Sequence, residues 1–213
     1  MKTCPLVSFS ALVLTAGVAH ASVLPQVAGE MKHAMIGFDG SAITAHVDDL
    51  PGEPATDPAV LVSYPGDDAY TAGGVLDGTY YSARYGWLSE GFISLPAGGA
   101  IWIEQLSTTP GLNIYEGGMR TMRENHTYAP LFGTEGSPDI WKWPGTMVHN
   151  WYSADAPGSY EASYRVYIGD EATGAALTGF GSADVSFSFV AVPAPGAPAV
   201  ALVGLALATR RRR

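Results

Sequence analysis

The aromatic residues between positions 141 and 152 are the first candidates for a binding function. Trp141 and Trp143 stand two residues apart, so an extended backbone would place both indole rings on one side. Trp151 and Tyr152 follow shortly after. Flat aromatic faces can stack on sugar rings, which makes these four residues a candidate glycan-binding site. Because aromatic side chains also dominate hydrophobic burial, we favour a role in the core over this alternative.

Histidine and carboxylate side chains are the candidates for metal binding. His126 and His149, with a carboxylate, could bind zinc or another transition metal. The histidines at positions 33, 46, 126 and 149 match no local zinc motif, however. Calcium could bind paired acidic residues in loops, but the chain has no EF-hand pattern, and aspartate is common in turns. The acidic pairs are Asp48-Asp49, Asp67-Asp68 and Asp170-Glu171. We therefore expect no cofactor, with zinc or calcium as the alternatives.

Catalytic motifs are absent from the sequence. Glu90 and Glu104 could act as a glycosidase pair if folding placed them across a cleft. The chain has no G-x-S-x-G elbow, H-E-x-x-H pair or phosphate-binding loop. We expect a protein without catalytic activity and keep glycoside hydrolysis as the less favoured alternative.

A period of two in the sequence predicts the strands that would position these residues. Within residues 160–168, every second residue is apolar or aromatic, and the solvent-facing positions are Glu161, Ser163, Arg165 and Tyr167. Around Phe187, the alternating polar positions are Asp184, Ser186 and Ser188. Further strands are expected at residues 43–47, 60–64, 79–87, 92–95 and 101–106, whereas residues 119–145 show no clear strand. Many short strands with frequent Gly and Pro turns predict an all-β domain, an antiparallel β-sandwich of jelly-roll-like type.

Charge and cysteine content restrict the classes of partner. All 20 acidic residues but only six basic residues lie between positions 22 and 191, so this part has a net charge of −14. Such a surface repels nucleic acid, whereas cations, cationic polymers or neutral glycans fit it better. A purely solubilising role for the charge is the interpretation we favour. The single cysteine, Cys4, precedes this part, which excludes disulfides and thiol catalysis from it.

The N-terminus has the three parts of a signal peptide. Lys2 supplies the positive charge, residues 6–18 are mostly apolar, and Ala19 and Ala21 give the small-x-small pattern that signal peptidase recognises. We expect a helical signal peptide at residues 1–21, removed by cleavage before Ser22.

The C-terminus combines a Pro/Gly turn, an apolar segment and an arginine cluster. Its marker residues are Pro193, Ala194, Pro195, Gly196, Arg210, Arg211, Arg212 and Arg213. The 12 residues at 197–208 would form a short helix of about 18 Å, against a bilayer core of about 30 Å. We therefore expect transient membrane contact by this segment instead of a permanent span.

This tail resembles the PEP-CTERM sorting signal in its VPAPG variant, with Ala194 in place of the name-giving glutamate. The resemblance implies that an exosortase-like membrane protease processes the tail at the cell surface, often near exopolysaccharide. Upstream, the segments at 149–151 and 156–160 are similar to the closing hairpin of β-rich bacterial surface modules that have such tails. That similarity implies a sandwich-like fold.

The sequence thus predicts three segments: a signal peptide at 1–21, a β-sandwich domain at 22–191 and a sorting and anchor segment at 192–213. We expect an exported, non-catalytic protein of the cell surface or extracellular matrix that serves adhesion or glycan binding. A metal-binding surface module is the alternative. The expected partners are signal peptidase, an exosortase-like protease and exopolysaccharide, without nucleic acid.

Overall fold

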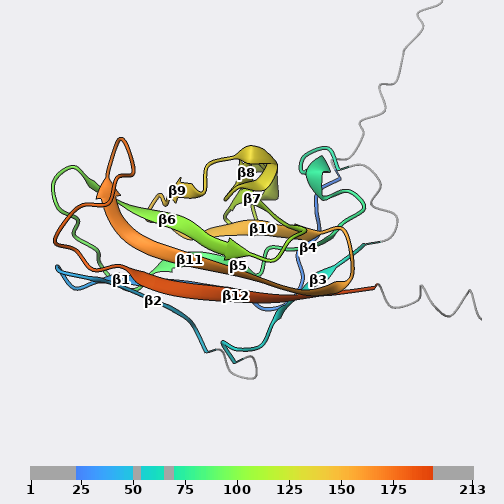
Figure 1. Ribbon diagram of the computed structural model, residues 1–213. Coiled ribbons are helices and arrows are strands. Elements are labelled where there is room, and N and C mark those ends of the chain that lie inside the picture. The colour runs from blue at the N-terminus through green and yellow to red at the C-terminus, as the bar shows by residue number, and fades with distance from the viewer. Residues whose placement is uncertain (1–22, 50–53, 65–69, 194–213) are drawn as a thin grey trace, which may run out of the picture.

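The computed structural model of the protein describes residues 23–49, 54–64 and 70–193 (Figure 1). This part is mostly β-structure, which confirms the predicted all-β class. Its helical pieces are three short 3-10 turns, η1 (Gly74–Leu76), η2 (Arg123–Asn125) and η3 (Thr134–Gly136). The predicted signal peptide with its expected cleavage site at Ser22, and the predicted sorting residues from Ala194 to Arg213, lie outside the described residues.

Twelve strands form one large sheet in the described part of the chain. They are β1 (Lys32–Phe38), β2 (Ile43–Val47), β3 (Ala59–Val62), β4 (Tyr80–Ser82), β5 (Tyr85–Ser89), β6 (Gly99–Thr108), β7 (Leu112–Gly118), β8 (Pro130–Leu131), β9 (Ile140–Lys142), β10 (Val148–Ala154), β11 (Gly158–Asp170) and β12 (Ala183–Val192). The strand order is β2-β1-β5-β10-β4-β3-β12-β11-β6-β9, and β7 pairs with both β10 and β8.

The sheet is mixed, which corrects the prediction of a purely antiparallel one. β1 runs parallel to β5, and β12 runs parallel to β3, while the other ladders between strands are antiparallel. The alternation of apolar and polar residues indicates a strand, but it does not indicate the direction of the strand beside it.

Several local predictions also differ from the structure. Residues 92–95 form a loop between β5 and β6, where the side chain of Phe92 is 91% exposed. Residues 119–145 contain the short strands β8 and β9, and neither β1 nor β7 was expected. Strand formation depends on pairing and packing with other segments, so local residue patterns alone do not reveal every strand.

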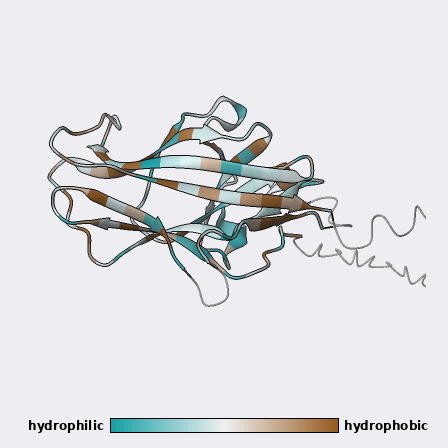
Figure 2. Cartoon of the chain, turned by 60° about the horizontal axis from the view of Figure 1, so that its bottom comes forward, coloured by the Kyte–Doolittle hydropathy of each residue, from teal (hydrophilic) through white to brown (hydrophobic). Residues whose placement is uncertain are grey.

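The sheet folds back on itself around an aromatic core. An isolated parallel bridge between Ala42 and Gly181 brings β2 beside the start of β12. Across the interior, the ring of Tyr85 on β5 stacks on Phe187 of β12, with 4.2 Å between centroids, and Trp87 meets Tyr164 of β11 edge-on. Such aromatic pairs add about 0.5–1.5 kcal/mol beyond the area that they bury. Figure 2 shows hydrophobic and hydrophilic residues interchanging along the strands.

β10 separates the main core from a second, smaller one. Neighbouring residues of a strand point to opposite faces. Tyr152 accordingly packs in the main cluster, while Trp151 packs with Tyr81, Tyr115 and Tyr128 in the second. All seven residues of β10 are buried, so both faces of this strand are covered.

Most basic side chains of the domain hold backbone segments in place. Arg84, Arg120 and Arg123 donate hydrogen bonds to carbonyl oxygens of residues 25–30, at 2.6–2.9 Å. The Nζ of Lys32 donates to the carbonyls of Pro54 and Asp57. Of the six basic residues at positions 22–191, these four are therefore occupied, which leaves Lys142 and Arg165 on the surface.

Candidate functional site

The four aromatic residues proposed as a glycan platform belong to the core. Trp141 and Trp143 are only 9% and 3% exposed, and Trp151 and Tyr152 are fully buried. The indole N–H of Trp141 donates to a carboxylate oxygen of Glu116, and that of Trp143 donates to the carbonyl of Thr146. The prediction of an exposed stacking platform is therefore wrong, and the favoured alternative of core packing is confirmed. Trp141 on the edge strand β9, Trp143 directly after it and Tyr152 on β10 pack into the main core cluster, and Trp151 on β10 packs into the second one.

His126 is bound on both ring nitrogens and is not free to ligate a metal. Trp151 donates its indole N–H to Nδ1 of His126 at 2.9 Å. Because the indole group can only donate, Nδ1 is the acceptor, and Nε2 carries the proton that it donates to the carbonyl of Met119 at 3.0 Å. Burial lowers the pKa of His126, which keeps the ring neutral in this role.

His149 is a buried neutral histidine in β10. Its Nδ1 donates to the carbonyl of Ala83 at 3.0 Å, and its ring lies against Gly86, where an added Cβ would come within 2.7 Å of it. Burial, followed by the charge of the neighbouring His33 ring, lowers the pKa of His149 to about 4. In the described ranges, no three His, Cys, Asp or Glu side chains gather as a metal site. Both ring nitrogens of His126 and Nδ1 of His149 are thus engaged in hydrogen bonds within the fold.

The carboxylates singled out for chemistry are engaged separately. Glu90 lies 3.9 Å from Nδ1 of His46, whereas Glu104 lies 3.7 Å from Arg165, and the groove lined by Glu104 does not include Glu90. Asp170 accepts hydrogen bonds from the backbone and hydroxyl of Thr173, which lower its pKa and identify it as a turn residue. The proposed glycosidase pair is therefore not assembled.

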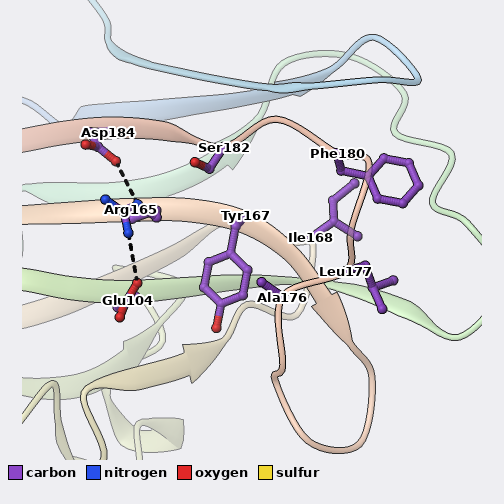
Figure 3. A pocket seen from close by; sticks show the side chains of 9 residues that line it. All are labelled: Glu104, Arg165, Tyr167, Ile168, Ala176, Leu177, Phe180, Ser182 and Asp184. Atoms are coloured by element: carbon purple, nitrogen blue, oxygen red, sulfur yellow. Dashed lines mark hydrogen bonds and ion pairs between the residues drawn. The ribbon is translucent and has the colours of Figure 1, made fainter.

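A groove of about 620 Å³ lies on the outer face of β6, β11 and β12 (Figure 3). In Figure 1 these strands run side by side, with β11 in orange between β12 in red and β6 in green. We call this hollow the Arg165 groove. Its lining residues are Glu104, Arg165, Tyr167, Ile168, Ala176, Leu177, Phe180, Ser182 and Asp184.

A row of three charged side chains crosses the floor of the Arg165 groove. The strand register places Arg165 opposite Glu104 on β6 and opposite Asp184 on β12. The guanidinium group lies 3.7 Å from the Glu104 carboxylate and 3.3 Å from that of Asp184. These side chains are 39–58% exposed, so a ligand in the groove can reach them. Figure 3 shows Arg165 pointing between the two carboxylates.

An apolar wall faces this charged row. The loop between β11 and β12 supplies Ala176, Leu177 and Phe180, and Tyr167 follows Arg165 on the same face of β11. The hydroxyl of Tyr167 donates to the carbonyl of Gly174 at 2.8 Å, which ties the loop to the strand. Burial raises the pKa of Tyr167, so its phenol stays neutral. The groove thus combines hydrogen-bonding groups on one side with apolar surface on the other.

The sequence contained part of this site, although the site itself was not predicted. Arg165, Tyr167 and Asp184 were placed on solvent-facing positions by the alternation of their strands. Their proximity depends on the pairing of β11 with β6 and β12, which residue patterns do not specify.

A second hollow, of about 440 Å³, is lined by Trp143 together with Phe92 and Pro144 of the surrounding loops.

A scan against protein-family models and a search of curated proteins both found no match to this chain.

Within residues 23–49, 54–64 and 70–193, no helix combines the length and the apolar character needed to span a membrane.

Proposed function

We propose that this is an exported, non-catalytic protein of the cell surface or extracellular matrix that binds a glycan in the Arg165 groove. The observation that carries the proposal is the open groove itself, with an exposed row of charged side chains opposite an apolar wall. Its volume of about 620 Å³ lies within the range of roughly 300–1,000 Å³ that is usual for small-ligand sites.

The chemistry of the groove fits a sugar. Each sugar ring carries hydroxyl groups around its edge, which both donate and accept hydrogen bonds, and C–H groups on its faces. Arg165 offers donors only, and the carboxylates of Glu104 and Asp184 offer acceptors. Leu177 and Phe180 provide apolar surface for the faces of the ring.

The position of Arg165 favours binding without hydrolysis. Glu104 and Asp184 lie on the two strands that flank β11, about 10 Å apart at the usual spacing of neighbouring strands. Glycosidases hold two carboxyl groups roughly 5–10 Å apart and leave the space between them for the scissile bond or for water. Here the guanidinium group fills that space and pairs with both carboxylates.

We also propose that the sheet is a β-sandwich of jelly-roll-like type and that the three sequence segments serve export. The contacts of β5 with β11 and β12 across the aromatic core support two facing layers. β12 ends at Val192, directly before the proline-rich tail, which supports a boundary at that point. Signal peptidase, an exosortase-like protease and transient membrane contact through the tail remain parts of this proposal.

Affinity electrophoresis of the exported protein tests glycan binding. At least one gel that contains hydroxyethylcellulose, dextran or chitosan should retard the wild type. Arg165→Ala should reduce this retardation, because Arg165 pairs with the carboxylates of Glu104 and Asp184 and positions them in the groove. Lys142→Ala is the matched control, because it removes the other exposed basic residue and its pairing with Glu171. Normal mobility of the wild type in every gel, or equal retardation of both variants, would refute the proposal. Release of reducing sugar from the bound polymer would refute the non-catalytic part.

A further inference from the structure

The polar face of β11 and β12 continues beyond the Arg165 groove. The register pairs Arg165 with Asp184, Ser163 with Ser186 and Glu161 with Ser188. We call these three cross-strand pairs the polar strip. The hydroxyl groups of its middle pair are hydrogen-bonded to each other at 2.8 Å.

The strip points away from the core along its whole length. The residues between its members, including Ala162, Tyr164, Val185 and Phe187, are buried on the opposite face of the same strands. Because side chains alternate across a strand, the members of the strip share the outer face. No main-chain shift interrupts the pairing of β11 with β12 over this stretch.

A second groove, of about 490 Å³, lies at the far end of the strip. We call it the Glu161 groove. Its lining includes Thr56, Pro58, Thr109, Glu161, Ser188 and Val190. The backbone N–H of Glu161 donates to the hydroxyl of Thr109 at 2.9 Å, which joins the turn after β6 to this end of β11. The polar strip therefore connects two grooves on one face.

The distance between the grooves exceeds the size of one sugar. Arg165 of one groove follows Glu161 of the other by four positions on β11, which corresponds to about 13 Å at the rise of a β-strand. A ligand that occupies both grooves must be extended along β11, and a linear chain of several sugar units has that form.

Charge complementarity identifies the kind of chain. The strip and the Arg165 groove contain the carboxylates of Glu104, Glu161 and Asp184 against the single cation Arg165. This surface belongs to a domain with a net charge of −14. A negative surface attracts cations and repels polymers that carry uronate or sulfate groups.

We propose that the two grooves and the polar strip form one continuous site for a linear polysaccharide of amino sugars with free ammonium groups. This inference rests on the proposed glycan binding and specifies its substrate class. Contact with both grooves makes the second contact intramolecular, so a chain long enough for both gains affinity by roughly 100-fold or more over a short fragment.

Isothermal titration calorimetry with glucosamine oligosaccharides tests this inference on the exported protein at mildly acidic pH. The probes are the disaccharide and the hexasaccharide, with the fully N-acetylated hexasaccharide as the uncharged comparison. The hexasaccharide should bind about 100-fold more tightly than the disaccharide. It should also bind more tightly than its acetylated form, and added salt should reduce that difference.

Three variants locate the site along the strip. Ser186→Tyr places a large side chain on the outer face between the grooves and should reduce hexasaccharide affinity to that of the disaccharide. Glu161→Gln should weaken binding of the hexasaccharide. It should leave the affinity for the disaccharide unchanged if the disaccharide occupies the Arg165 groove. Glu124→Gln, which removes one carboxylate at η2, is the control and should change neither affinity.

The outcomes separate this inference from the proposed function. Equal affinity for the two chain lengths, equal affinity for the charged and acetylated chains, or full hexasaccharide binding by Ser186→Tyr would overturn the inference while glycan binding stands. Loss of all binding by the wild type to these probes, together with normal mobility in every polysaccharide gel, would overturn both.

Discussion

Acid should destabilise the folded protein through His149. This ring is buried in β10, its Nδ1 donates to the carbonyl of Ala83, and its Nε2 has no hydrogen-bond partner among the residues that the structure describes. Its pKa is about 4 in the folded state, against an ordinary value of 6.5. Between these two pH values the unfolded chain binds more protons than the folded one, so the free energy of unfolding falls as the pH falls.

The size of the effect follows from the pKa difference. Because one pKa unit corresponds to about 1.4 kcal/mol, the contribution of His149 drops by about 2 kcal/mol between pH 7 and pH 5, and by about 3 kcal/mol in total below pH 4. A loss of 2 kcal/mol is a large share of the 5–15 kcal/mol that is usual for a domain.

Urea denaturation followed by tryptophan fluorescence measures this loss. His149→Gln is the test variant, since its amide can donate to Ala83 but does not titrate. The stability lost by this variant between pH 7 and pH 5 should be smaller than the wild-type loss by about 2 kcal/mol. Burial also lowers the pKa values of His33 and His126, so these two histidines contribute to the loss of stability in both proteins.

Equal losses in the wild type and in His149→Gln would refute this reasoning. Titration of the wild type by NMR provides an independent check that does not need the variant to fold. The ring signals of His149 should show no protonation step above pH 5, and a step near its ordinary pKa would contradict the burial argument.

Three further substitutions test the cores and the Arg165 groove. Trp151→Phe replaces the buried indole by a smaller aromatic ring and leaves Nδ1 of His126 without its donor, and chemical denaturation should show a loss of about 1–3 kcal/mol. Phe187→Ala removes the ring that stacks on Tyr85 and should cost about 3–5 kcal/mol by the same method; a loss below 1 kcal/mol would contradict its central place in the core. Arg165→Ala should change the free energy of unfolding by less than about 1 kcal/mol, because its ion pairs are exposed, while weakening glycan binding. A large loss of stability in this last variant would indicate a structural role instead.

The outer face of β11 shows how far the sequence could predict this site. Its alternation identified Arg165 as solvent-facing and Tyr164 as buried, which the structure confirms, whereas Tyr167, also expected to face solvent, is only 9% exposed. The opposition of Arg165 to Glu104 and Asp184 arises from strand pairing across 61 and 19 residues of sequence. Pairing over such distances is decided by the whole fold, so local periodicity could not reveal the charged row.

The tryptophan segment shows the opposite limit. Trp141 and Trp143 have a spacing that suits an exposed stacking platform as well as a buried strand, because the residue type fits both environments. The burial of the tryptophan rings depends on the pairing of β9 with β6 and on the covering of both faces of β10. The spacing of the residues encodes neither of these features. Phe92 illustrates the same point in reverse, since a β-prone segment became an exposed loop.

Amide chemical shifts in a two-dimensional NMR titration with the glucosamine hexasaccharide test the central claim most directly. Binding in the grooves on β11 and β12 predicts shifts at Ser163, Arg165, Asp184 and Ser186, with the amides around Trp151 unchanged. Shifts confined to Phe92 and the hollow beside it, or no shifts at saturating ligand, would contradict the assignment of glycan binding to this face.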